Sequence, residues 1–183
     1  MDYPTAQLVD RSGIDCILIG DSLGMTALGY SGTVPVMGHI GLTPQLVSKL
    51  GGFKVQGKSA ETGVQLLKDA LSMQKAGCFA IVIEAIPDRV AQVITEKLTI
   101  PTIGIGAGPH CDGQNLVLHD MVGLFDRFTP KFVKRYANCG DVIGKALADF
   151  QDDVHKGQFP LAEHSFTMKE DEYQAFLHKV GKS

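Results

Sequence analysis

The sequence predicts an α/β fold built around a parallel sheet, for three reasons. Amphipathic helices that stop at a glycine recur along the chain, and each is followed by a short apolar run that ends at a carboxylate or a glycine-rich turn. These runs are continuously apolar rather than alternating, which is typical of parallel strands covered by helices on both faces. Hydrophobic residues make up 44% of the 183 residues and no linker divides them, so we expect one core.

The first helix–strand unit is expected near the N-terminus. A helix over residues 5–11 is followed by Gly13, which can take the left-handed conformation, and an apolar strand over residues 15–20 then leads to a carboxylate. A second strand, over residues 36–42, runs into Thr43-Pro44, where threonine is a favoured cap and proline fits the first turn of a helix.

The second complete unit begins at Ser59, which is expected to cap a helix that stops at Gly77. The apolar strand over residues 79–83 follows and ends at Glu84. This order of helix, glycine, strand and carboxylate repeats the first unit, and right-handed connections between parallel strands follow from it.

The third unit has a helix over residues 90–98 and a strand over residues 102–105 that opens into a glycine-rich turn at residues 106–108. The apolar run 116–118 is a further candidate strand, ahead of His119 and Asp120, for which an ordinary loop contact is the favoured interpretation. A helix with apolar residues from Val142 to Val154 and a polar amphipathic tail complete the chain.

Candidate functional residues stand at the predicted strand ends. The carboxyl ends of parallel strands meet at one edge of a sheet, so Asp21, His39, Glu84 and the turn after Gly106 are expected to share a site. Carboxylates there can bind a metal ion or transfer a proton, or cap the next element; the two interpretations weigh equally for Asp21, and a functional role is slightly favoured for Glu84. For His39, a hydrogen bond to backbone is favoured over a contact with a substrate. The glycine turn does not match dinucleotide-binding spacing, and Asp112-Gly113 is interpreted first as a turn.

Composition favours small-molecule chemistry. The formal charge of −3 and the absence of a Lys/Arg-rich run give no basis for binding nucleic acid or an anionic membrane. No apolar run approaches the roughly 20 residues of a spanning helix. The four cysteines include no CxxC pair, so reduced thiols in an intracellular protein are expected.

Five motifs, in this order, resemble those of the ketopantoate hydroxymethyltransferase family. They extend from Gly20 almost to the C-terminus, so the resemblance is far more specific than any one of them. The motifs are GDSLGM at 20–25, GHIGLTPQ at 38–45, GGFKVQGK at 51–58, IGIGAG at 103–108 and EHSF at 163–166.

The resemblance implies a (β/α)8 barrel that forms large homo-oligomers. It also implies a Mg²⁺ ion that chelates 3-methyl-2-oxobutanoate and makes its C3 acidic, and 5,10-methylenetetrahydrofolate as the donor of the one-carbon unit. By motif match, Asp21 is expected to be a metal ligand, Ser22 a contact to the substrate carboxylate, Glu84 the base that takes the C3 proton, and His39 a residue of the substrate pocket. The folate contacts are not assigned.

The sequence departs from the family after residues 33–36. Family members continue there through two further βα units, which carry an ADLPF-type motif with a second metal-binding Asp and a K-x-EGG-type motif with a substrate-binding Lys; neither motif occurs here. We therefore predict an incomplete barrel over residues 1–166, lacking about three strands, with a deletion at about 36–37 and marginal folding. Residues 167–183 are predicted to be an amphipathic extension, and only Asp2-Tyr3-Pro4 remains of the family's first strand motif.

These features leave competing hypotheses. One is an impaired hydroxymethyltransferase, and another is a non-catalytic splice or gene-model fragment that at most joins complete subunits. A third is a different barrel enzyme with a phosphate site at GIGAG, which the lack of a second glycine-rich loop disfavours. The extension resembles that of eukaryotic members, which suggests a mitochondrial location for the complete protein, with the cytoplasm as the alternative.

Overall fold

A computed structural model describes residues 3–16, 35–43, 54–125 and 127–181 of the chain. The elements in these ranges are mixed α and β, as predicted. They are α1 (Tyr3–Arg11), β1 (Met37–Gly41), α2 (Ala60–Lys75), β2 (Ala80–Glu84), α3 (Asp88–Lys97), β3 (Thr102–Ile105), β4 (Gly113–Gln114), α4 (Leu118–Met121), α5 (Cys139–His155), the 3-10 helix η3 (Ala162–His164) and α6 (Glu170–Lys179).

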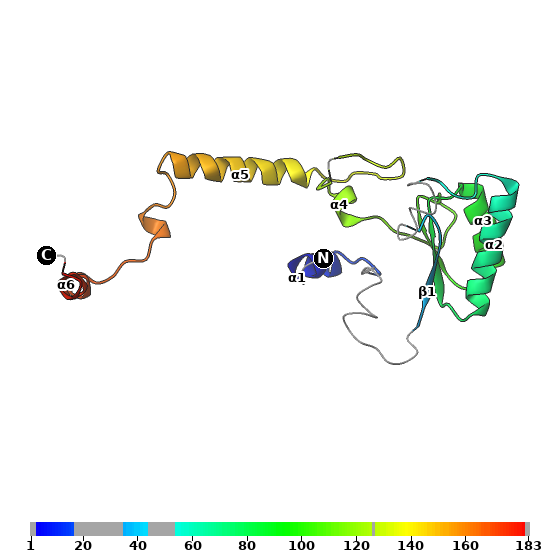
Figure 1. Ribbon diagram of the computed structural model, residues 1–183, viewed down its shortest axis with the longest axis horizontal. Helices are drawn as coiled ribbons and strands as arrows, with labels where there is room; N and C mark the ends of the chain where they lie inside the picture. The colour runs from blue at the N-terminus through cyan, green and yellow to red at the C-terminus, as the bar shows by residue number, and fades with distance from the viewer. Residues whose placement is uncertain (1–2, 17–34, 44–53, 126, 182–183) are drawn as a thin grey trace.

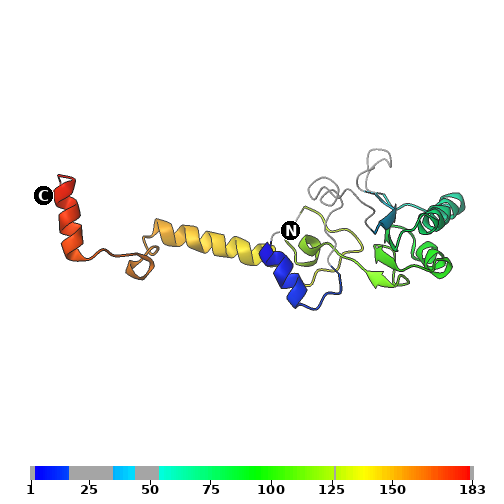
Figure 2. The ribbon, with the colours of Figure 1, turned by 90° about the horizontal axis from the view of Figure 1, so that it is seen from below.

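A four-stranded sheet in the order β1-β2-β3-β4 organises the body of the protein. Every neighbouring pair is parallel, which confirms the prediction of a parallel sheet. The helices α2 and α3 cover one side of this sheet in both views (Figures 1 and 2). Consecutive parallel strands joined through helices are the building plan of a (β/α) barrel.

The predicted helices and strands within the described ranges form close to their expected boundaries, with one exception. Residues 116–118 are not a strand, because the fourth strand is Gly113–Gln114 and Leu118 already begins α4. Three apolar residues are too few for the pattern to distinguish a strand from the start of a helix. The predicted strand over residues 15–20 and the helix after Thr43 lie largely outside the described residues.

The helix α2 begins at a capping box centred on Ser59. The Ser59 hydroxyl accepts a hydrogen bond from the Thr62 backbone N–H at 3.2 Å, and the Thr62 hydroxyl oxygen accepts one from the Ser59 backbone N–H at 3.0 Å. Both backbone donors would otherwise lack a partner at the start of the helix. The sequence-based assignment of Ser59 as the cap is confirmed.

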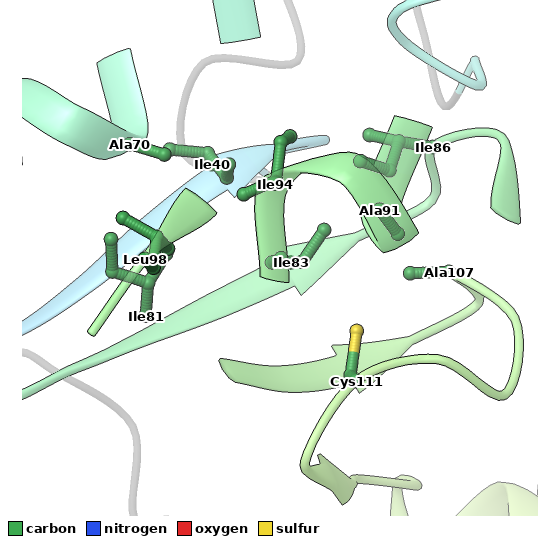
Figure 3. Packing of buried hydrophobic residues seen from close by; sticks show 10 residues of the cluster. All are labelled: Ile40, Ala70, Ile81, Ile83, Ile86, Ala91, Ile94, Leu98, Ala107 and Cys111. Carbon is green, nitrogen blue, oxygen red and sulfur yellow. The ribbon is translucent and has the colours of Figure 1, made fainter. Parts of the chain in front are cut away.

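The hydrophobic core lies between the sheet and the pair α2 and α3 (Figure 3). Ile81 and Ile83 of β2 and Ile94 of α3 are fully buried there. Ala80 and Val82, which point to the opposite face of β2, are buried as well, so this strand is covered on both faces. That arrangement explains why its sequence is continuously apolar.

The C-terminal part of the chain extends away from this body. In both views α5 leads from the region of α4 to η3 and α6 at the far end (Figures 1 and 2). No residue of α5 is buried, and its apolar side chains Val142, Leu147 and Phe150 are 70%, 64% and 55% exposed. We call the exposed apolar residues of this helix the α5 stripe: Val142, Ile143, Leu147, Phe150 and Val154. None of the helices in the described part of the chain is long and apolar enough to cross a membrane.

We predict that Ile83→Ala lowers the free energy of unfolding by about 2–5 kcal/mol, because it opens a cavity where the side chain is fully buried. Urea unfolding followed by circular dichroism measures this change. Val64→Ala on α2 is the control, since Val64 is 52% exposed and the change should be within about 0.5 kcal/mol. Equal effects of the two substitutions would contradict the position of the core.

Candidate functional site

The parallel register places the predicted site residues at one edge of the sheet. Gly41 at the end of β1 pairs with Glu84 at the end of β2, and Glu84 pairs with Ile105 at the end of β3. His39 and Glu84 project from the same face, because side chains two residues apart on a strand share a face and Gly41 is the partner of Glu84. The register therefore brings His39 and Glu84 together and places the end of β3 beside Glu84. Asp21, which was expected at the same edge, lies outside the described residues.

His39 and Glu84 are in direct contact. Nε2 of His39 lies 3.0 Å from Oε2 of Glu84, and the side chains are 30% and 15% exposed. This distance suits an ion pair when the imidazole is protonated, but the ring nitrogen makes no well-aligned hydrogen bond with the described residues and is buried. Nε2 of His39 is thus a buried polar atom in close contact with Glu84 that has no aligned hydrogen bond with the described residues.

The backbone around Glu84 is held by the neighbouring strand ends. Leu42 N–H donates to the Glu84 carbonyl at 2.9 Å. Gly41 has a φ of +90°, and a Cβ at this position would lie 2.1 Å from the same carbonyl oxygen. Only glycine permits both the left-handed backbone and this approach. The placement of Glu84 thus depends on a residue of a different strand.

The residue after Glu84 is strained. Ala85 is buried and has a φ of +49°, a conformation that costs a non-glycine residue about 1–2 kcal/mol. Its N–H donates to the Ile105 carbonyl at 2.9 Å and its carbonyl accepts from the Gln56 N–H at 3.0 Å. These two bonds keep the chain turned sharply just beyond the carboxylate, where backbone strain often accompanies function.

The glycine-rich turn after β3 packs against protein side chains. A Cβ on Gly106 would lie 2.7 Å from the Phe132 ring, and one on Gly108 would lie 2.4 Å from Cβ of Asp88. Gln114 also donates from Nε2 to the Gly108 carbonyl at 3.0 Å. The close backbone approach that the sequence suggested is thus explained by packing within the chain.

Thr102 and Asp112 form a part-buried clasp that fixes the start of β3. Asp112 accepts hydrogen bonds from the Thr102 N–H at 2.8 Å and the Thr102 hydroxyl at 3.0 Å, and Thr102 is fully buried. The adjacent Cys111 is buried in the core cluster, and burial raises the pKa of its thiol. Asp112 therefore does more than form the turn expected from its sequence, because it satisfies a buried threonine.

Two predicted site residues, Asp21 and Ser22, lie outside the described residues, so their roles stay predictions. Within the described ranges, no group of three or more His, Cys, Asp or Glu side chains is placed to hold a metal ion. The part of the site that the structure describes is thus one carboxylate and one imidazole at the ends of β1 and β2, which can accept and donate a proton.

Comparisons with known proteins decide the family. A protein-family model described as ketopantoate hydroxymethyltransferase matches the sequence over residues 1–36 and 30–162. A 3-methyl-2-oxobutanoate hydroxymethyltransferase of Oleidesulfovibrio alaskensis is 41% identical over 254 residues, which cover 98% of this chain and 88% of the relative. The chain belongs to the ketopantoate hydroxymethyltransferase family. The resemblance drawn from the sequence motifs is confirmed.

Other relatives with the same printed name agree. The protein of Heliobacterium modesticaldum is 41% identical over 245 residues, covering 93% of this chain and 89% of the relative. That of Nitratidesulfovibrio vulgaris strain DP4 is 38% identical over 256 residues, covering 99% and 83%. The ketopantoate hydroxymethyltransferase family is one of enzymes, and the His39–Glu84 pair lies within the region that its model matches.

Sequence reasoning missed two features of this family member. The strain at Ala85 has no sequence signal, because alanine is not a residue that marks a positive φ. The Thr102–Asp112 clasp joins residues ten apart in the sequence. The sequence showed only that Asp112 precedes a glycine, and this pair of residues usually indicates a turn.

We predict that Gly41→Ala destabilises the chain far more than Gly77→Ala. Both glycines have positive φ, but Gly77 has open space around its Cβ position whereas Gly41 faces the Glu84 carbonyl at 2.1 Å. The control should lose about 1–2 kcal/mol from backbone strain alone, and Gly41→Ala should lose at least twice as much. Urea unfolding midpoints compare them, and similar losses would mean that the contact with Glu84 is not restrictive.

Proposed function

We propose that this chain descends from an enzyme that transfers a hydroxymethyl group from 5,10-methylenetetrahydrofolate to 3-methyl-2-oxobutanoate, giving 2-dehydropantoate for pantothenate biosynthesis, and that the chain itself retains only a small part of that activity. The observation that carries the proposal is the contact between His39 and Glu84 at neighbouring strand ends. The names of the relatives supply the keto acid.

Glu84 is the proposed base. Its carboxylate takes the proton from C3 of the keto acid, and the electron pair left on C3 forms a bond to the methylene carbon of the folate donor. The two bonds from this carbon to folate nitrogens break, and the nitrogens take one proton from Glu84 and one from water. The hydroxide left by that water forms the new hydroxyl group, so that the keto acid, the donor and water give 2-dehydropantoate and tetrahydrofolate. The side chain is 15% exposed, which lets it reach a substrate while limiting competition from water.

His39 is the proposed substrate contact. Its Nε2 is buried without an aligned partner among the described residues, and a buried donor without a partner costs about 1–3 kcal/mol. A substrate oxygen placed in line with the N–H would satisfy it. Because the same imidazole lies against Glu84, a substrate bound to His39 would lie close to the proposed base.

The metal and the remaining substrate contact are assigned by motif only. Mg²⁺ prefers several oxygen ligands, and the described residues by themselves do not fit it, because Glu84 faces an imidazole and forms no group of metal-binding side chains. The proposal gives Asp21 as a Mg²⁺ ligand and Ser22 as a contact to the substrate carboxylate.

Weak activity is proposed because part of the family sequence lacks a counterpart. The match to the Oleidesulfovibrio alaskensis relative runs over 254 aligned positions, whereas this chain has 183 residues, so at least 71 positions are unmatched. The two stretches that match the family model meet at residues 30–36, where we place the deletion. A barrel without these strands would lose the second metal-binding Asp and the substrate-binding Lys that the resemblance implies.

Association with other subunits is the alternative function. The α5 stripe exposes apolar side chains along a helix with no buried residue, and such surfaces commonly mark protein interfaces. A homo-oligomer, or a complex with complete family chains, would cover it. For the complete protein we propose a mitochondrial location, with the cytoplasm as the alternative.

We predict that the chain catalyses slow exchange of the C3 proton of 3-methyl-2-oxobutanoate with solvent, and that Glu84→Gln lowers this rate by about 10²-fold or more, since the amide cannot act as the base. Proton NMR in D₂O measures the exchange without folate. Glu61→Gln, on the exposed first turn of α2, is the control and should leave the rate unchanged. An unaltered rate in Glu84→Gln would remove Glu84 from this role.

We also predict that complete turnover to 2-dehydropantoate is at least about 10²-fold slower than in the Oleidesulfovibrio alaskensis relative, because positioning and charge stabilisation by the missing groups supply much of the rate. The assay uses both substrates with excess Mg²⁺. A rate near that of the relative would refute the proposed impairment and leave the family assignment intact.

A further inference from the structure

A groove of about 580 Å³ runs between α2 and the outer edge of β1. One wall contains the three consecutive residues His39, Ile40 and Gly41. Successive side chains of a strand point to opposite faces, so a groove that touches all three touches the edge of the strand itself. In the described part of the chain, β1 is an end strand of the sheet.

The other wall is one face of α2. Four of its residues and its C-cap recur at intervals of three and four, which is the spacing of a continuous helix face: Thr62, Gln65, Asp69 and Ser72 of α2, and the C-cap Ala76. This stripe extends over about 21 Å at 1.5 Å per residue. It flanks the part of α2 that packs into the core, because Leu66 and Met73 both line the groove and pack against the core. The stripe therefore extends the packing surface of α2 beyond its core contacts.

The groove adjoins the site of the proposed deletion. The two matches to the family model meet at residues 30–36, immediately before β1 begins at Met37. The unmatched positions number at least 71 in total, which is enough for two βα units, since a βαβ unit takes about 30 residues or more. Consecutive strands of such folds usually lie side by side, with right-handed crossovers. The unit that precedes β1 in complete relatives would thus pair with this edge and place a helix beside α2.

We propose that this groove is the docking surface for the βα unit that precedes the counterpart of β1 in complete ketopantoate hydroxymethyltransferases, supplied by a second polypeptide. The inference rests on the proposed deletion. The unit adds a parallel strand at β1 and packs its helix on the small and polar stripe of α2. Small side chains such as Ser72 and Ala76 allow a close approach of the two helices.

A second copy of this chain fits the groove less well. By the proposal it lacks the required unit, and two β1 edges related by a two-fold axis would pair antiparallel, unlike every strand pair described. A small ligand would leave most of the long α2 stripe uncovered. The parallel edge and the extended helix face together favour a strand–helix unit.

The test uses the full chain and a separate polypeptide containing the residues of the Oleidesulfovibrio alaskensis relative that align between Val36 and Met37. Calorimetric titration should give saturable binding with one segment per chain. Ser72→Trp fills the groove and should weaken binding at least tenfold, whereas Lys68→Trp, on the exposed side of α2 outside the groove, should change it less than twofold. Circular dichroism first confirms that both variants keep their helical content.

Hydrogen exchange on the unmodified chain provides a second measurement that needs no variant. Segment binding should slow exchange of the β1 amides, because the added strand occupies this edge. Absence of binding, binding unaffected by Ser72→Trp, or unchanged exchange at β1 would each overturn the inference. Self-association that Ser72→Trp abolishes, without segment binding, would also overturn it and assign the groove to a second copy. No keto acid, metal or folate is present, so these results are independent of the outcome of the proton-exchange assay.

Discussion

The parallel alignment of β1, β2 and β3 at residues Gly41, Glu84 and Ile105 is the constraint on which the candidate site depends. Gly41 approaches the Glu84 carbonyl too closely for any Cβ. The peptide between Glu84 and Ala85 is held at both ends, because its carbonyl accepts from the Leu42 N–H and its N–H donates to the Ile105 carbonyl. A shift of one residue in this register would turn the Glu84 side chain to the opposite face and away from His39. The chemistry of the site is thus set by the backbone of three strands before any side chain is considered.

The sequence predicted the sheet well because the controlling signals are local. The continuously apolar run before Glu84 indicated a strand buried on both faces, and the structure buries Ala80 to Ile83 in that way. The meeting of His39 and Glu84 followed from the rule that parallel strand ends share an edge. The prediction of a strand at residues 116–118 was wrong, because so short an apolar run carries no usable periodicity. Leu118 instead starts α4.

Features that depend on contacts between distant residues were not predictable. Ala85 has a positive φ and its backbone is hydrogen-bonded to Ile105 and Gln56, and the residues next to Ala85 in the sequence give no sign of that geometry. Asp112 reaches back to Thr102 across the turn at the end of β3. In both cases the surrounding fold imposes a local conformation that the residue itself does not prefer, which is the usual limit of reasoning from one sequence.

The arrangement of the retained residues bears on how catalytic ability could be divided within this family. Proton removal needs a base and a contact that places the substrate, and the contact between Glu84 and His39 in a single hydrogen-bonded sheet has the geometry that we propose for such a pair. In the proposed reaction, carbon–carbon bond formation also needs the keto acid and the folate donor to be held in line, and we assign those contacts to other strand ends. The proposed loss of βα units would therefore remove the second requirement before the first. Under this proposal the chain exchanges the proton without efficient transfer, because the proposed base and the remainder of the proposed site belong to different strands.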